Sequence, residues 1–141
     1  MSPELEEEIF KKYPRLFQRE DPDGQRFGSS CYEFSCGDGW FHIIDTLCRN
    51  IQNYSDNHQD GLDQEDAEYY QVTVQQVKEK FGSLRFYISG GDDYIYGMIS
   101  MAEAISEKTC EDCGAKAEVT TKGWIRNLCF KCNDKPKEEE Q

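Results

Sequence analysis

The sequence predicts an α+β fold, with helices packed on a small antiparallel β-hairpin or sheet and a C-terminal four-cysteine zinc-finger module. Three patterns support this prediction: helical spacing of apolar residues in three segments, alternation in two adjacent segments, and two Cys-x-x-Cys steps near the C-terminus. The 141 residues suffice for one ordinary domain, or for a small domain plus a zinc-sized module. We therefore expect an α+β body at 1–107, a zinc-binding module at 108–135 and an acidic tail at 136–141.

Three segments of the body are predicted to be helices. Residues 3–13 begin at Ser2-Pro3, a favourable N-cap and first-turn pair. Residues 39–54 carry an apolar stripe at helical spacing, formed by Trp40, Ile44, Leu47, Cys48 and Ile51. Residues 93–107 follow the capping residue Asp92 and carry a second stripe, formed by Ile95, Met98, Ile99, Ala102 and Ile105.

A β-hairpin is predicted over residues 71–89, because two strand-like segments flank the glycine-containing turn at 80–83. Val74 and Val77 are out of phase by one residue, which predicts a bulge or an edge position. The polar, turn-rich residues 18–30 and the acidic residues 56–68 are predicted to be loops.

The strongest chemical signal is the pair of Cys-x-x-Cys steps, which 15 residues separate. This spacing is that of a four-thiolate zinc site, and four thiolates leave no open coordination position for catalysis. We therefore predict one structural zinc ion, with an iron–sulfur cluster, a redox dithiol or free thiols as the alternatives. The predicted ligands are Cys110, Cys113, Cys129 and Cys132.

The remaining features of the module leave its class open. Gly114 is the small residue that closes a zinc knuckle, and residues 119–124 are predicted to form a small hairpin. If the second Cys-x-x-Cys step opens a short helix, the module is treble-clef-like; otherwise it is a zinc ribbon.

A second metal site at Cys31, Cys36, His42 and Cys48 is disfavoured. On a helix His42 and Cys48 lie about 120° apart around the axis, and Cys48 belongs to the apolar stripe. His42 and Asp45 share the opposite helix face, so a small hydrolase using this couple is one alternative function. Because no nucleophile accompanies them, we expect a protein that is not an enzyme.

The body and the C-terminal module differ in charge, and each charge favours a different kind of partner. Residues 1–107 carry 9 Lys and Arg against 21 Asp and Glu, whereas residues 108–137 carry 7 against 4, and the whole chain has a net charge of −12. The acidic body favours a protein partner, whose basic surface it would attract. The basic module makes nucleic-acid binding the alternative, with Trp124 for stacking and cations at Lys116, Lys122, Arg126, Lys131, Lys135 and Lys137.

The sequence predicts a cytoplasmic protein without a membrane partner. No stretch approaches about 18 consecutive apolar residues, and the first ten residues are acidic where a signal peptide is basic. In a reducing compartment the seven cysteines favour metal ligation or core packing over disulfides.

Four strings together resemble a family of small proteins encoded by tailed bacteriophages and prophages. They are Cys36-Gly-Asp-Gly-Trp40, Val77-Lys-Glu-Lys-Phe-Gly-Ser-Leu-Arg-Phe-Tyr87, Cys110-Glu-Asp-Cys-Gly114 and Gly123-Trp-Ile-Arg-Asn-Leu-Cys129. Family members can carry a histidine at the last ligand position, where Cys132 here completes an all-thiolate set. The resemblance implies an origin and not an activity: a cytoplasmic accessory protein that acts during infection of a bacterium, with no catalytic residues to carry over. The closed metal site, the lack of a catalytic constellation and the acidic body favour an interaction module that inhibits or modulates a host protein.

Overall fold

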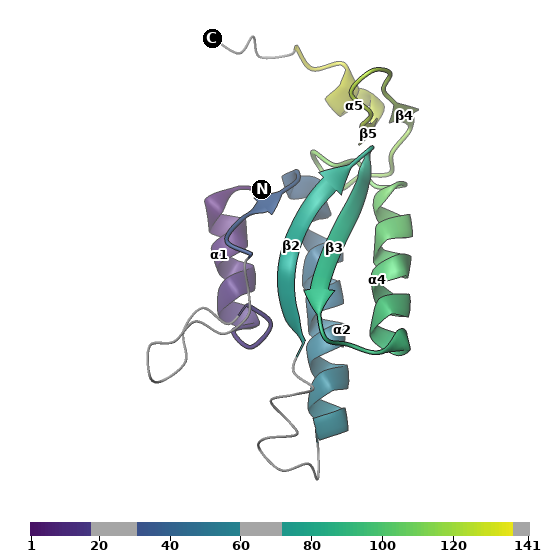
Figure 1. Ribbon diagram of the computed structural model, residues 1–141. Coiled ribbons are helices and arrows are strands. Elements are labelled where there is room, and N and C mark those ends of the chain that lie inside the picture. The colour runs from purple at the N-terminus through teal and green to yellow at the C-terminus, as the bar shows by residue number, and fades with distance from the viewer. Residues whose placement is uncertain (18–30, 60–71, 137–141) are drawn as a thin grey trace.

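Helices and a three-stranded sheet form the body of the fold, and a smaller unit follows at the C-terminal end (Figure 1). The computed structural model describes residues 1–17, 31–59 and 72–136, and it confirms the predicted α+β class. The body contains the elements α1 (Pro3–Lys12), β1 (Phe34–Ser35), the 3-10 turn η1 (Asp38–Trp40), α2 (Phe41–Gln59), β2 (Thr73–Lys80), β3 (Ser83–Ser89) and α4 (Asp93–Ser106). The C-terminal unit contains β4 (Val119–Thr120), β5 (Asn127–Leu128) and α5 (Phe130–Asn133).

All three predicted helices are present, and their apolar stripes lie toward the core except at Ile105, which is 47% exposed. Helix α1 starts at Pro3, and α4 begins after Asp92, whose side chain accepts a hydrogen bond from the Ile95 amide at 3.0 Å. Helix α2 continues to Gln59, so the loop predicted from residue 56 begins too early. Asp56 accepts a hydrogen bond from Gln52 one turn earlier and pairs with Arg15 at 2.7 Å, which stabilises the extra turn. The rest of this predicted loop and the loop predicted at 18–30 lie outside the described residues.

The sheet is mixed, which corrects the prediction of an antiparallel sheet. Strands β2 and β3 form the predicted antiparallel hairpin, and a register shift between Val74 and Gln76 confirms the bulge. The short strand β1 lies parallel to β2, with Phe34 opposite Val77. Contacts from the first helix hold β1 in place, because the Phe34 amide donates to a Glu6 carboxylate oxygen at 2.9 Å.

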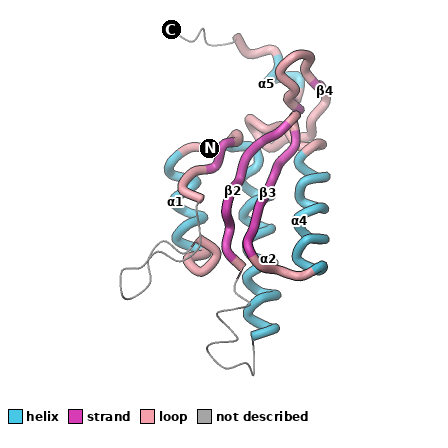
Figure 2. The backbone as a smooth tube through the Cα atoms, in the orientation of Figure 1, coloured by secondary structure: helices cyan, strands magenta, loops and turns pink. Residues whose placement is uncertain are grey.

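The core lies between one face of the sheet and the helices α2 and α4, as the paths of these elements in Figure 2 show. Trp40, Ile44, Val77 and Leu84 are almost completely buried there. Phe10, Phe17 and Phe34 form an aromatic cluster between α1 and β1, with ring centroids 5.1 to 5.7 Å apart. Among the described helices, none combines the length and the apolar character that crossing a lipid bilayer requires.

Candidate metal centre

The first Cys-x-x-Cys step forms a tight turn that brings two thiols to the same side of the chain. The Gly114 amide donates to the carbonyl of Cys110 at 2.9 Å, and the Cys110 amide donates to Ala115 at 2.7 Å. Gly114 has a φ of 83°, in the left-handed region where a side chain is strained. The glycine after the second cysteine therefore has the knuckle-closing role predicted from the sequence.

The second Cys-x-x-Cys step, Cys129 to Cys132, lies between the end of strand β5 and the first residues of helix α5. Cys129 is the N-cap of α5, and its sulfur accepts a hydrogen bond from the Cys132 amide at 3.4 Å. The short strands β4 and β5 pair between the two steps, with Val119 opposite Leu128. The order of knuckle, hairpin and short helix is that of the treble-clef-like alternative.

The four predicted ligand atoms lie together in the structure. All four sulfurs lie within 4.8 Å of one another, and the Sγ atoms of Cys113 and Cys129 are 3.7 Å apart. Zn–S bonds of about 2.3 Å in a tetrahedron place sulfurs about 3.8 Å apart, so the cluster is nearly of the required size. The four thiols thus form a possible structural metal site of zinc-finger type.

The acidities of the thiols reflect their mutual proximity. Burial raises the pKa of the Cys110 thiol, but backbone amides of Cys129, Cys113 and Asp112 outweigh burial and lower this pKa to about 7. Burial and hydrogen bonds among the sulfurs raise the pKa of Cys132 to about 12. A divalent cation favours the thiolate form of all four groups, so metal binding releases protons from this cluster.

The body supports the first knuckle through the segment at 37–40, a contact that the sequence analysis missed. The Gly39 amide donates to the Glu111 carbonyl at 2.8 Å, and the indole of Trp40 donates to the Thr109 carbonyl at 3.1 Å. A Cβ atom on Gly39 would lie 2.2 Å from the carbonyl oxygen of Cys110. Glycine is therefore required at position 39 by the close approach of the two backbones.

Glu111, inside the first Cys-x-x-Cys step, joins the knuckle to the body and to β5. Its buried carboxylate accepts a hydrogen bond from the Gly37 amide at 2.9 Å and pairs with Arg126 Nε at 3.5 Å. Arg126 also pairs with Asp112. Arg126 is one of the cations that the sequence predicts for nucleic-acid binding, but in the structure it is paired with two carboxylates. No spacing rule distinguishes Glu111 from any other residue between two ligands, so the sequence carries no signal for this role.

The other residues predicted for nucleic-acid contact are largely at the surface. Trp124 is 75% exposed, so it does not serve as the apolar core of the zinc module. The four described lysines of this set are also exposed, namely Lys116, Lys122, Lys131 and Lys135. Lys137 lies outside the described residues.

The disfavoured second metal site is not assembled. Within residues 1–17, 31–59 and 72–136, the only group of potential ligands brought within 4.8 Å is the four-cysteine cluster. Cys31, Cys36 and Cys48 are buried in the core, and burial raises the pKa of Cys36 to about 12. Burial also raises the pKa of Cys48, so Cys36 and Cys48 are protonated and behave as small apolar side chains.

Asp45, predicted to share a polar face with His42, is instead buried against α1. Its carboxylate accepts a hydrogen bond from the Tyr13 hydroxyl at 2.6 Å and pairs with Lys12 and Arg49. His42 is exposed, and among the described residues no hydrogen bond joins it to Asp45. The partners of Asp45 are thus those of a structural contact between helices.

Comparison of the chain with protein-family models, with curated proteins and with solved structures gave no match.

Proposed function

We propose that the protein is a non-enzymatic binding protein in which a structural zinc ion holds an aromatic recognition surface in place. The zinc assignment is supported by the four-sulfur donor set and its near-tetrahedral size, since zinc prefers four thiolates in closed sites. The observation that carries the binding role is the 75% exposure of Trp124, beside the metal cluster. An exposed tryptophan is costly in water and typical of recognition surfaces.

A second exposed aromatic residue lies in the β2–β3 turn, where the body contacts the C-terminal unit. Phe81, in the turn between β2 and β3, is 71% exposed and has a φ of 52°, an unusual left-handed conformation for a bulky residue. Its neighbour Gly82 packs on Ile125, and the Gly82 carbonyl accepts a hydrogen bond from Asn127 at 2.9 Å. We call the surface formed by Phe81, Trp124 and Ile125 the aromatic tip.

The partner that we propose for the aromatic tip is a protein. Interface centres are enriched in tryptophan and phenylalanine, and the aromatic tip exposes one of each. The phage resemblance favours a host or phage protein in the bacterial cytoplasm, whose activity this chain modulates or inhibits. The net charge of −12 would accelerate encounters with a basic partner.

Nucleic-acid binding is the second candidate, because the exposed indole of Trp124 is also suited to stacking on a base. The engagement of Arg126 with Glu111 and Asp112 weakens this candidate by removing one of its cations. The net negative charge also opposes a long polyanion.

The metal role is tested by replacing one ligand and one core cysteine. Cys113→Ser should abolish stoichiometric zinc and speed amide exchange over residues 108–135, because this segment has few apolar residues to stabilise it. Cys48→Ser is the matched control and should retain one zinc ion per chain. Loss of zinc in the control, or retention in Cys113→Ser, would contradict the assignment.

The recognition role is tested by Trp124→Ala, with Tyr94→Ala as the matched control. Tyr94 is a 61% exposed aromatic residue on α4, away from the metal cluster. In pull-downs from bacterial lysate, we expect Trp124→Ala to lose a stoichiometric protein that the control retains, while both variants keep their zinc. Equal recovery by both variants would contradict the proposal. Nuclease-sensitive recovery would favour the nucleic-acid candidate.

A further inference from the structure

One face of the sheet is not covered by α2 or α4 and carries an unusual pair of cations (Figure 1). Val77 and Phe86 lie directly opposite each other and point into the core, so their neighbours Lys78 and Arg85 form the next cross-strand pair on the outer face. Like charges directly opposite each other destabilise a sheet. Among the described ion pairs, none involves either residue.

The guanidinium of Arg85 is held over this face by its own strand. Its Nη1 atom donates to the Ser83 hydroxyl at 2.9 Å and to the Leu84 carbonyl at 3.0 Å. These bonds use the two N–H groups of Nη1, so the donors on Nε and Nη2 are the ones that remain for a ligand. Two adjacent cations without carboxylate partners are suited to an anion that accepts several hydrogen bonds, such as a phosphate group.

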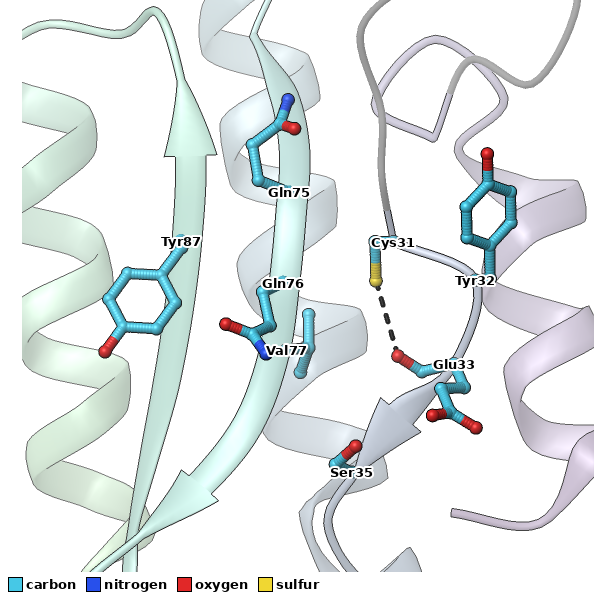
Figure 3. Close-up of a pocket in the computed structure, with 8 residues that line it drawn as sticks. All are labelled: Cys31, Tyr32, Glu33, Ser35, Gln75, Gln76, Val77 and Tyr87. Carbon is cyan, nitrogen blue, oxygen red and sulfur yellow. Dashed lines mark hydrogen bonds between the residues drawn. The ribbon is translucent and has the colours of Figure 1, made fainter.

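A pocket of about 510 Å³ includes Gln76 and Tyr87 in its lining (Figure 3). These two residues form the cross-strand pair on the same face as Lys78 and Arg85, two positions along each strand. Strand β1 is only two residues long, and Phe34 and Ser35 are its residues paired with β2. The preceding chain at 31–33 runs beside β2 without pairing, and the pocket lies between them. Strand β3 contributes Tyr87, and Gln76 lies directly opposite it on β2. The volume is within the range of small-molecule sites, about 300–1,000 Å³.

The lining of the pocket combines aromatic, amide and apolar groups. Tyr32 and Tyr87 are 50% and 44% exposed and lie on opposite sides of it, on the chain before β1 and on β3. Gln75 and Gln76 contribute amides, whereas the side chain of Val77, the next lining residue along β2, is buried in the core. Aromatic rings stack on planar heterocycles, and glutamine amides bind the hydrogen-bonding edges of nucleobases.

We propose that this pocket and the Lys78–Arg85 pair together bind a nucleotide. The base lies in the pocket, where it packs on Tyr87 and is contacted by the Gln76 amide opposite it, and the phosphate lies on the two cations. Glu33 is the one acid among the lining residues; it disfavours phosphate inside the pocket and accepts hydrogen bonds from exocyclic amino groups of a base. The base and the phosphate are therefore bound by different residues: the base by the pocket and the phosphate by Lys78 and Arg85.

A nucleotide unit can come from a free nucleotide or from a single strand of nucleic acid, which share this chemistry. The net charge of −12 opposes a long polyanion, so the free nucleotide is the expected source. The site lies on the sheet face and does not include the aromatic tip, so it goes beyond the function proposed above.

The test is calorimetric titration of the full-length, zinc-loaded protein with AMP, ATP, adenosine, ribose 5-phosphate and a single-stranded oligonucleotide of about ten thymidines. We expect AMP or ATP to bind at least tenfold more tightly than adenosine or ribose 5-phosphate, since each of these lacks one half of the ligand. Tighter binding of the oligonucleotide than of any mononucleotide would support the same site with the single strand as its source. Absence of binding by all phosphate-bearing probes at millimolar concentration would overturn the proposal.

Three variants locate the binding on the sheet face. Lys78→Gln should weaken nucleotide binding about tenfold and reduce its salt dependence, and Tyr87→Ala should weaken AMP without changing the response to salt. Lys135→Gln, which removes an exposed cation from the C-terminal unit, is the matched control and should bind as the wild type does. Equal affinities for Lys78→Gln and the control would overturn the assignment. Trp124→Ala should leave nucleotide binding unchanged, so a failure of the aromatic-tip proposal is separable from a failure here.

Discussion

At the scale of single residues, Asp45 shows how a charged group is accommodated in the interior. It is only 6% exposed, and burial raises its pKa. The Tyr13 hydroxyl and the cations of Lys12 and Arg49 outweigh burial, so the pKa of Asp45 falls below its ordinary value. Burial and the hydrogen bond to Asp45 raise the pKa of Tyr13 to about 12, so the tyrosine remains a donor at all ordinary pH values.

This arrangement predicts a specific dependence of stability on pH. Because the pKa of Asp45 is lower in the folded protein, its carboxylate stabilises the fold above the unfolded pKa of about 3.9, and this contribution is lost as pH falls through the folded value. Asp45→Asn should reduce the free energy of unfolding at pH 7 by about 1–3 kcal/mol, measured by urea denaturation. Below the folded pKa the difference between variant and wild type should shrink.

The matched control for Asp45 is Glu7→Gln, the same acid-to-amide change at a surface ion pair. Glu7 is 59% exposed and pairs with Lys11 at 3.5 Å, so the expected loss is below about 1 kcal/mol at any pH. If both variants lose the same stability at pH 7, the buried network around Asp45 has no special role.

At the scale of elements, helix α4 protects the free edge of strand β3. The Leu84 amide donates to the Ser106 hydroxyl at 2.8 Å, and the Phe86 amide donates to the Glu103 carboxylate at 3.2 Å. An uncovered strand edge invites pairing with other chains, and side chains that occupy its N–H groups prevent this. The helix thus satisfies backbone donors that a fourth strand would otherwise bind.

Removing one of these hydrogen bonds should destabilise strand β3 mainly at the residue whose amide loses its acceptor. Ser106 is completely buried, so Ser106→Ala leaves the Leu84 amide without its acceptor and should cost about 1–3 kcal/mol of stability. Amide exchange at Leu84 should accelerate more than exchange elsewhere in β3. Ser100→Ala, an exposed position on the same helix, is the control. Unchanged exchange at Leu84 in Ser106→Ala would show that the hydroxyl is dispensable.

Comparison of these elements with the sequence shows which features could be predicted. The stripe through Ile44 and Leu47 and the alternation around Phe86 are local patterns, and both gave the correct element. The sequence also predicts that Cys110, Cys113, Cys129 and Cys132 come together, because the geometry of a metal site restricts the spacing of its ligands, and the structure brings their sulfurs together. Strand β1 was missed because two residues are too few to show a period.

The errors at individual residues have a common physical cause. Asp45 was expected on a polar helix face, yet the chain of α1 covers that face. Arg126 was expected to be free, yet Glu111 and Asp112 surround it. The charged partners of Asp45 and Arg126 include residues distant in the sequence or brought close by a turn. Such contacts leave no periodic pattern in the sequence from which they could be predicted.

At the scale of the whole molecule, the metal centre and the body are coupled through backbone contacts. The Gly39 amide binds the Glu111 carbonyl on one side of the knuckle, and Asn127 binds the Gly82 carbonyl on the other. These contacts predict that the effect of metal removal extends into residues 36–40 and into the β2–β3 turn.

Gly39→Ala tests this coupling without touching a ligand. The new Cβ would lie 2.2 Å from the Cys110 carbonyl oxygen and 2.6 Å from the Gly114 nitrogen, both backbone atoms that cannot rotate away. The knuckle must therefore shift, and we expect a loss of stability of about 1–3 kcal/mol together with faster zinc release to a chromogenic chelator.

Gly97→Ala is the matched control for the coupling, because the same added methyl group there meets no atom within 4 Å. Position 97 lies inside helix α4, where alanine is favoured over glycine by up to about 1 kcal/mol, so this variant should unfold at a higher urea concentration. Its zinc release should match that of the wild type. If Gly39→Ala also releases zinc at the wild-type rate despite its lower stability, the knuckle is held by its metal alone, and residues 37–40 serve only the core of the body.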